Sequence, residues 1–262
     1  MRVVVCIKHV PDVLSERRIE NGRLVRGEDD TLNELDENAV EAAVQVVEDH
    51  GGEVIAITMG PEGAEDSAML ALQKGADRAV VVTDDRLAGS DAVGTAHVLA
   101  GVINQLATEG PIDLVLTAMA SVDGMTSMLP AALGASLNWP VLGVVHEIEV
   151  SPQRVEIARS ADGFNDRLAA PLPAVVSVTD QLNEPRYPNF KAMKAARSKP
   201  LDIWSLDDLT DADLQRWAVG EEGAGTQILS ASADSGQRAG RIVNDAGNGG
   251  EELANYIREV VK

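Results

Sequence analysis

Residues 119–128 hold the side chains with the clearest capacity to bind a phosphate. Asp123 and Gly124 favour a tight turn, and the hydroxyls of Thr126 and Ser127 are hydrogen-bond donors. The segment lies between an apolar run and a helical stretch, and a helix N-terminus that follows a parallel strand attracts the phosphate of a nucleotide. An ordinary Asp-Gly turn with Ser and Thr capping is the alternative, and spacing alone leaves both interpretations open.

Residues 183–199 concentrate positive charge in an acidic protein. The segment has five Lys and Arg against one Glu, so its net charge is +5 − 1 = +4. Two prolines favour an extended approach to a basic helical stretch that begins at Phe190. An exposed apolar anchor among cations suits docking to an acidic partner protein. A solvated helix with Phe190 packed inward explains the same residues equally well.

The common signatures of catalysis are absent from the sequence. Neither G-x-x-x-x-G-K-[ST] nor G-x-G-x-x-G occurs, and there is no G-x-S-x-G nucleophile elbow. The four histidines lack zinc-ligand spacing, and Cys6 lies in an apolar run where a small hydrophobe is expected. We therefore predict no catalytic residue and no metal site.

The elements that must position these segments follow a βαβ pattern. Short runs rich in Val and Ile, without alternation, predict strands buried on both faces at residues 3–7, 54–58, 79–83 and 112–117. Apolar residues at helical spacing between the runs predict helices, with Asn33 or Asp36 and Ser90 or Asp91 as N-caps. The fold class is therefore predicted to be α/β, with a parallel sheet and right-handed crossovers.

The second half of the chain changes pattern twice. Alternating residues in 146–150 and 155–157, with turns at 151–153 and 162–163, predict an antiparallel addition to the sheet. Residues 217–250 contain eight glycines and no sustained period, and 251–261 predict a short helix. We predict a domain over 1–200, which includes the basic segment, and an extended arm over 201–262 that lies against another surface.

Composition excludes several classes of protein. The 262 residues include 22 Lys and Arg against 42 Asp and Glu, which gives a net charge of −20. Such a charge repels nucleic acid and anionic lipid, so neither partner is expected. No apolar run is long enough to span a membrane, the N-terminus lacks a signal-peptide pattern, and the single cysteine suits a reducing compartment. We expect a cytoplasmic protein.

Seven segments together resemble the β subunit of electron transfer flavoprotein, a family that includes the FixA-type proteins. The match covers nearly the whole chain, and its most specific part is the sequence Asn-Glu-Pro-Arg-Tyr at 183–187. The segments are 5–12, 32–43, 60–61, 71–78, 121–124, 172–176 and 183–187.

The resemblance implies a Rossmann-like domain of the adenine-nucleotide-binding type in a heterodimer. The α subunit of such a pair holds most of one FAD, and the β subunit carries AMP and an arm that embraces the α subunit. The pair accepts electrons from flavin dehydrogenases of the acyl-CoA dehydrogenase type and passes them to a quinone reductase. It serves fatty acid β-oxidation or a nitrogen-fixation branch, and the β subunit is an electron carrier rather than an enzyme.

The resemblance also assigns site residues. The AMP contacts fall on Cys6, Asn33, Met59, Asp123, Gly124, Met125, Thr126 and Ser127. The docking segment for dehydrogenases falls on Arg186, Tyr187, Phe190, Lys191 and Lys194, with Phe190 as the anchor.

Two other functions stay open from the sequence. Met125 and Met128 stand where the common family loop has Asp and Gln, and some relatives bind a second FAD at this site and bifurcate electrons with NADH chemistry. A free-standing AMP- or ATP-binding sensor module is the remaining alternative, because related α/β folds serve that purpose.

Overall fold

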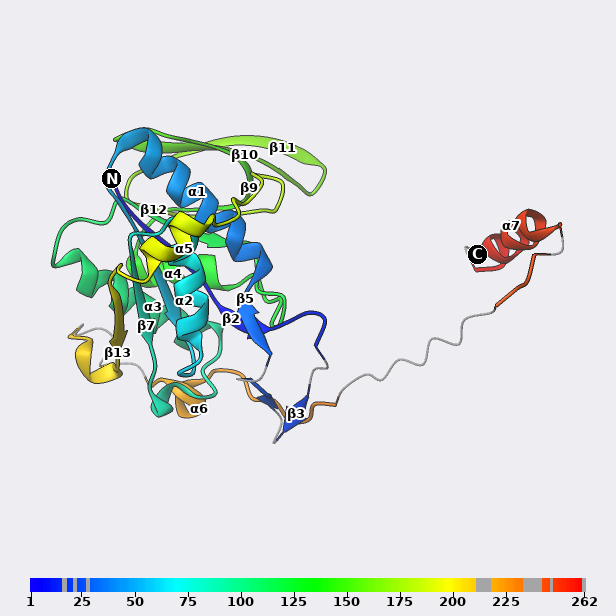
Figure 1. Ribbon diagram of the computed structural model, residues 1–262, viewed down its shortest axis with the longest axis horizontal. Helices are drawn as coiled ribbons and strands as arrows, with labels where there is room; N and C mark the ends of the chain where they lie inside the picture. Colours follow the sequence, from blue (N-terminus) through cyan, green and yellow to red (C-terminus); the bar gives the residue numbers. More distant parts are fainter. Residues whose placement is uncertain are drawn as a thin grey trace. The chain divides into compact units, whose positions relative to one another are not determined.

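The structure is a computed structural model that describes residues 1–15, 18–20, 23–26, 29–210, 218–232, 242–245 and 247–260. The chain divides into a larger unit, Met1–Ala231, and a smaller unit, Ser232–Lys262 (Figure 1). Residues 201–210 and 218–231, which we assigned to the arm, lie with the larger unit. The reason is that Leu201–Trp204 pairs with the sheet and Leu209 is buried in the core.

A mostly parallel sheet forms the centre of the larger unit (Figure 1). Its strands are β1 (Arg2–Cys6), β6 (Glu53–Met59), β7 (Arg78–Val82), β8 (Leu114–Ala118), β9 (Val141–Val150), β10 (Arg154–Ala161), β11 (Phe164–Pro171), β12 (Ala174–Val178) and β13 (Leu201–Trp204). Their order is β11-β10-β9-β12-β8-β1-β6-β7-β13. In this order, every neighbouring pair from β9 through β12, β8, β1, β6 and β7 to β13 is parallel. The pairs β9 with β10 and β10 with β11 are antiparallel and form a meander. The predicted α/β class and the antiparallel addition are confirmed.

Helices cover both faces of this sheet. They are α1 (Glu34–His50), α2 (Ala64–Lys74), α3 (Ala92–Ala107), α4 (Leu129–Leu137), α5 (Phe190–Ala196) and α6 (Gly220–Gly223), with short 3₁₀ turns η1 (Asp85–Leu87) and η2 (Leu206–Asp208). Alternate residues of β1 face opposite layers: Val3 and Val5 pack with α1 and α2, and Val4 packs with α3 and α4. Because both faces are buried, the strands show no polar alternation in the sequence.

The chain reverses direction across the sheet next to β1. It passes from β1 to β6 and β7 on one side, and then crosses to β8 on the other side of β1. Ligands of open α/β sheets bind beyond the carboxyl ends of the strands at such a switch point. The fold therefore predicts a site between the segments that follow β1 and β8.

Two small antiparallel pairs, which the sequence did not predict, lie between β1 and α1 in the chain. They are β2 (His9–Pro11) with β5 (Asp30–Leu32), and β3 (Ile19–Glu20) with β4 (Arg23–Leu24). His9 Nδ1 and the Ser67 hydroxyl form a hydrogen bond of 2.8 Å, which connects β2 to α2. β5 leads directly into Asn33 and α1, so these strands determine where α1 begins.

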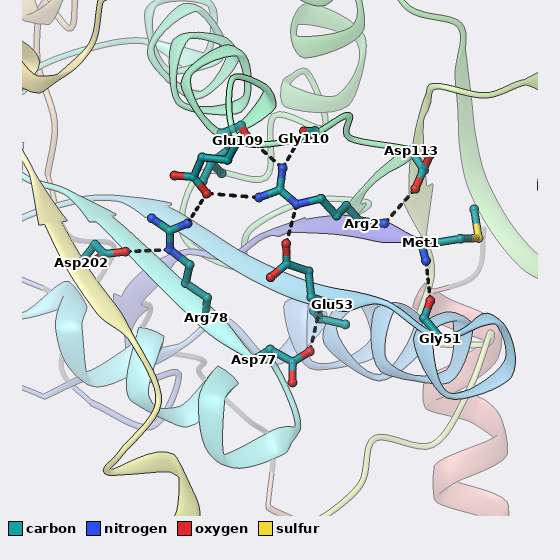
Figure 2. Close-up of polar contacts among 12 residues, drawn as sticks. Met1, Arg2, Gly51, Glu53, Asp77, Arg78, Glu109, Gly110, Asp113 and Asp202 are labelled. Carbon is teal, nitrogen blue, oxygen red and sulfur yellow. Dashed lines mark hydrogen bonds and ion pairs between the residues drawn. The ribbon is translucent and has the colours of Figure 1, made fainter.

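The amino ends of the parallel strands are joined by ion pairs (Figure 2). Arg2 pairs with Glu53 and Glu109, and its amide donates to Asp113 at 2.8 Å. Arg78 pairs with Glu109 at 2.6 Å and with Asp202 at 2.7 Å. These contacts connect β1, β6, β7 and β13 with the end of α3 and fix the register of the strands at this end.

The smaller unit contains the helix α7 (Gly249–Val260), which confirms the helix predicted near the end of the chain. Leu253, Tyr256, Ile257 and Val260 follow helical spacing, and each is about half exposed or more within the chain. Among the described helices, none is long and apolar enough to cross a membrane.

Candidate functional site

The predicted cofactor residues gather at the carboxyl edge of three adjacent parallel strands. Cys6 ends β1, Met59 ends β6, and residues 123–127 follow β8. The Cys6 side chain is buried, and this burial, with a smaller contribution from Asp36, raises the pKa of its thiol. The Cys6 side chain therefore packs in the core as a small hydrophobe, as the apolar run predicted.

Asn33 joins the start of α1 to the segment that follows β8. It occupies the predicted N-cap position, but its side chain makes no capping hydrogen bond. Instead its Nδ2 donates to the Ala120 carbonyl at 3.1 Å, and its Oδ1 accepts from the Val122 amide at 3.0 Å. Asn33 is fully buried, so this bridge fixes the path of the backbone just before Asp123.

Asp123 is held by two cations from the N-terminal part of the chain. Its carboxylate accepts from Lys8 Nζ at 2.9 Å and from the Arg26 guanidinium, which also donates to the His9 carbonyl at 2.9 Å. Burial disfavours the charged carboxylate, but the two cations outweigh it and hold the pKa of Asp123 well below its usual range. With 3% of its side chain exposed, Asp123 orients the loop rather than facing a ligand.

The residues after Asp123 present backbone amides at the surface. Met125 and Ser127 have φ values of 48° and 51°, the left-handed region, while Met128 is right-handed with φ −88° and ψ −29°. α4 has no side-chain cap, and the amides of Thr126, Ser127 and Leu129 make no hydrogen bond to the described part of the chain. A left-handed residue next to a right-handed one, as at Ser127 and Met128, is typical of backbone turns whose amides bind an anion.

A buried acid with an unusual pKa lies next to this loop. The carboxylate of Asp36, in the first turn of α1, accepts the Lys8 amide at 2.7 Å. Burial, opposed by hydrogen bonds from Asn33 and Lys8, raises the pKa of Asp36 to about 7. At the end of β6, the fully buried Thr58 hydroxyl has no hydrogen-bond partner in the described structure. A hydrogen-bonding group without a partner among the described residues is therefore present near this edge of the sheet.

The basic segment exposes its aromatic side chains. Tyr187 is 93% exposed and Phe190 is 79% exposed, so the alternative in which Phe190 packs inward is not observed. α5 begins at Phe190 because the Asn189 side chain caps it, accepting from the Ala192 amide at 2.9 Å. Met193, 39% exposed, lies on the same short helix.

The cationic side chains of residues 183–199 fall into two groups, those bound within the chain and those that are exposed. Lys199 donates to the carbonyls of Leu72 and Ala76 at 3.1 and 2.6 Å, and Arg186 is bound by carboxylates of α1. The side chains of Lys191, Lys194 and Arg197 are exposed and have no ion pair with any residue that the structure describes. The exposed charge around Phe190 therefore comes from α5 and its end.

Sequence reasoning missed most of the polar partners in both regions. Lys8 and Arg26 hold the loop after β8 through Asp123, Asp36 accepts the Lys8 amide, and Glu41 and Glu48 hold Arg186. Lys8, Asp36 and Glu41 stand inside two segments, 5–12 and 32–43, that carried the family resemblance. Their position in these two segments was the one indication of a role, because nothing in the local sequence shows which distant charged residue each of them contacts.

The parallel sheet, with helices on both faces and a switch point next to β1, defines a Rossmann-like α/β protein. The family description "Electron transfer flavoprotein domain" matches residues 22–209. The chain is 35% identical over 264 residues to the electron transfer flavoprotein subunit beta of Mycobacterium leprae, covering 97% of each chain. It is 34% identical over 242 residues to the protein FixA of Azorhizobium caulinodans, covering 90% of this chain and 85% of FixA.

A third relative is the caffeyl-CoA reductase-Etf complex subunit CarD of Acetobacterium woodii. It is 30% identical over 247 residues, which cover 93% of this chain and 92% of CarD. The chain therefore belongs to the electron transfer flavoprotein family, with the beta subunits and FixA-type proteins, and is an electron-transfer subunit.

Proposed function

We propose that this chain is the β subunit of a cytoplasmic heterodimer that carries electrons from flavin dehydrogenases to a quinone reductase. FAD, bound mainly by the α subunit, supplies the electron-accepting chemistry, and this chain positions the α subunit and docks the donor. The observation that carries the proposal is the aromatic pair Tyr187 and Phe190, exposed on a cationic segment of a family member. Exposed aromatic anchors among cations suit an apolar pocket with an acidic rim.

The carboxyl edge of the sheet at the switch point suits an adenine nucleotide with a structural role, AMP by the family resemblance. The amides of Thr126, Ser127 and Leu129 would hold its phosphate, since they are free of other partners in the described chain. Lys8, whose side chain is 41% exposed, keeps a donor for an anion after binding Asp123 and Ser121. Cys6 and Met59 would contribute backbone contacts where β1 and β6 end.

The apolar stripe of α7 supports the proposed α-subunit partner. Leu253, Tyr256, Ile257 and Val260 lie on one face of a twelve-residue helix, and no residue of this face is buried within the chain. An amphipathic helix gains stability mainly by burying its apolar face. A companion subunit provides the surface that this stripe needs.

The docking role predicts a specific defect in the variant Phe190→Ala. With an acyl-CoA dehydrogenase as the donor, we expect its apparent KM to rise about tenfold or more, because a central aromatic anchor contributes about 2 kcal/mol or more to binding. The FAD content of the heterodimer stays unchanged. Steady-state reduction of the heterodimer at varied dehydrogenase concentration measures this.

The chain offers a matched control, because it contains two phenylalanines. Phe164 is also exposed, at 70%, but it begins β11 in the antiparallel meander. Phe164→Ala should leave the donor kinetics unchanged. Equal kinetics in Phe190→Ala and the wild type would reject the docking role.

A bifurcating flavoprotein with a second FAD and NADH chemistry is the second candidate. The observation that favours it is the similarity to CarD, whose name places that protein in a complex with caffeyl-CoA reductase. Two flavins per purified heterodimer would support this candidate, and a single flavin would reject it.

A further inference from the structure

Arg186 is bound by two carboxylates that project from α1. Its Nε and Nη2 donate to Glu41 at 2.7 and 3.0 Å, and its Nη1 and Nη2 donate to Glu48 at 2.7 and 3.0 Å. The two acids differ in burial, since the Glu41 side chain is 6% exposed and the Glu48 side chain is 57% exposed. Bidentate pairing of this kind fixes both position and orientation of a guanidinium.

Glu41 also holds the backbone of the docking segment. Its Oε2 accepts the Arg186 amide at 3.1 Å in addition to the guanidinium. Burial disfavours the charged form of Glu41, but the hydrogen bonds from Arg186 outweigh it and lower the pKa of this carboxyl. Glu41 is therefore an ionised, buried acceptor whose contacts converge on one residue of the segment.

Two more contacts fix the backbone around the same point. The Arg186 carbonyl accepts from Lys74 Nζ at 3.2 Å, and Lys74 is itself paired with Glu37 at 2.9 Å. Three residues earlier, the side chains of Asn38 and Asn183 each donate to the carbonyl of the other residue, at 2.9 and 3.0 Å. Side chains of α1 and α2 therefore hold the segment from 183 to 186 at both backbone donors and acceptors.

This polar attachment ends where the exposed aromatic side chains begin. Tyr187 follows Arg186 directly, and the Lys74 ammonium lies 5.7 Å from the centre of its ring. Tyr187 and Phe190 are almost free of packing contacts, so packing does not set their positions. The fixed backbone before Tyr187, together with the capped helix α5 for Phe190, sets their positions, and a fixed backbone lowers the entropy that docking must overcome.

We propose that Glu41 is a positioning residue for donor docking: through Arg186 it holds the segment in the conformation that presents Tyr187 and Phe190. This inference rests on the proposed docking function. It assigns Arg186 to the support of the docking surface, because its guanidinium is bound by two carboxylates of α1. Glu48 binds the same guanidinium from a solvated position and makes no contact with the backbone of the segment.

The test compares Glu41→Gln with Glu48→Gln in the FAD-loaded heterodimer. Glutamine keeps the size of the side chain but cannot accept the guanidinium and the amide as a carboxylate does. With an acyl-CoA dehydrogenase as donor, we expect Glu41→Gln to raise the apparent KM about tenfold, with kcat and FAD content within about twofold of the wild type. Glu48→Gln should change KM by less than about twofold, because solvated ion pairs contribute little.

Phe190→Ala separates failure of this inference from failure of the docking function. If Phe190→Ala raises KM and Glu41→Gln does not, the positioning role is wrong and the docking role stands. If neither variant changes KM, the docking function itself is wrong.

A spin label provides a second readout that needs no donor protein. Cys6 is the single cysteine and is buried, so a label reacts selectively with Phe190→Cys. We expect the label to move more freely when Glu41→Gln is added and to be unaffected by Glu48→Gln. Equal mobility in all three proteins would overturn the positioning role, even if Glu41→Gln had lowered stability.

Discussion

The two ends of the parallel sheet differ in how completely their polar groups are paired. At the amino end, Arg2 and Arg78 each bind more than one carboxylate, and the pairs connect neighbouring strands (Figure 2). The carboxyl end has the paired Asp123, but there the buried Asp36 has no ion pair, and the Thr58 hydroxyl and the amides of residues 126, 127 and 129 have no partner, among the residues that the structure describes. Unpaired polar groups are therefore found beside paired ones at the carboxyl end.

This difference separates stability from binding within one sheet. Satisfied buried polar groups stabilise a fold, whereas unsatisfied ones cost free energy unless a ligand completes them. The amino end therefore holds the strands in register, and the carboxyl end carries the polar groups that would hold the nucleotide we propose. Variants at the two ends should consequently fail in different ways.

The largest effect is expected from Asp36 at the carboxyl end. Because burial raises the pKa of Asp36 to about 7, its stabilising contribution is complete below the unfolded value, about pH 4, and is lost as the pH rises through 7. The loss is about 4 kcal/mol at most, from a shift of about three units. Asp36→Asn should flatten this decline in the free energy of unfolding, measured by urea denaturation from pH 4 to 8.

Asp91 provides the control of opposite sign. The amide of Gly94 lowers the pKa of this N-cap carboxyl, so its contribution is present above about pH 4 and is lost as the pH falls. Asp91→Asn should therefore leave the slope near pH 7 unchanged. An unchanged slope in Asp36→Asn would mean that Asp36 does not titrate there.

The next effect is expected at the amino end. Arg2→Ala leaves Glu53 without its cation and the Leu106 carbonyl without its donor. We expect the free energy of unfolding to fall by about 3 kcal/mol, because Glu53 and the carbonyls of Leu106 and Gly110 lose their donor together. Arg154→Ala removes an exposed pair with Glu156 and should cost less than about 0.5 kcal/mol. Bound nucleotide should be unaffected in both, and a loss of nucleotide in Arg2→Ala would break the separation of the two ends.

A smaller loss of stability, with a larger loss of nucleotide, is expected from Asn33→Ala. The change removes the bridge to Ala120 and Val122 and should cost about 2 kcal/mol. Without the bridge the loop after β8 loses its fixed path, so the affinity for AMP should fall about tenfold in isothermal titration calorimetry. Asn165→Ala, on the exposed strand β11, should change neither quantity. Unchanged AMP affinity in Asn33→Ala would show that the bridge serves the fold alone.

The sequence was sufficient for the central strands and helices because burial leaves a local signal. Val3–Val5 and the other apolar runs predicted β1, β6, β7 and β8, and Asp91, one of two candidates, is the cap of α3. The pairs β2 with β5 and β3 with β4 were missed, since two- and three-residue strands are too short for a pattern. β13 was assigned to the arm because Leu201–Trp204 is short and stands among acidic residues.

The sequence predicted which loops form the candidate site but not the distant residues that hold them. Residues 123–127 and 183–199 stood out by turn chemistry and by charge, which are local properties. The partners that shape them are distant in sequence: Asp123 lies 115 residues from Lys8, and Arg186 lies 145 residues from Glu41. Such pairs depend on the tertiary fold, and composition gives no means of matching one acid to one base.

The nucleotide content of the purified heterodimer tests the central claim most directly. The chain should be produced with its α subunit, denatured, and the released adenine nucleotides quantified by chromatography and mass spectrometry. We expect one FAD and one AMP per heterodimer. A chain that purifies alone as a stable monomer, or a heterodimer that releases no nucleotide beyond its FAD, would contradict the account.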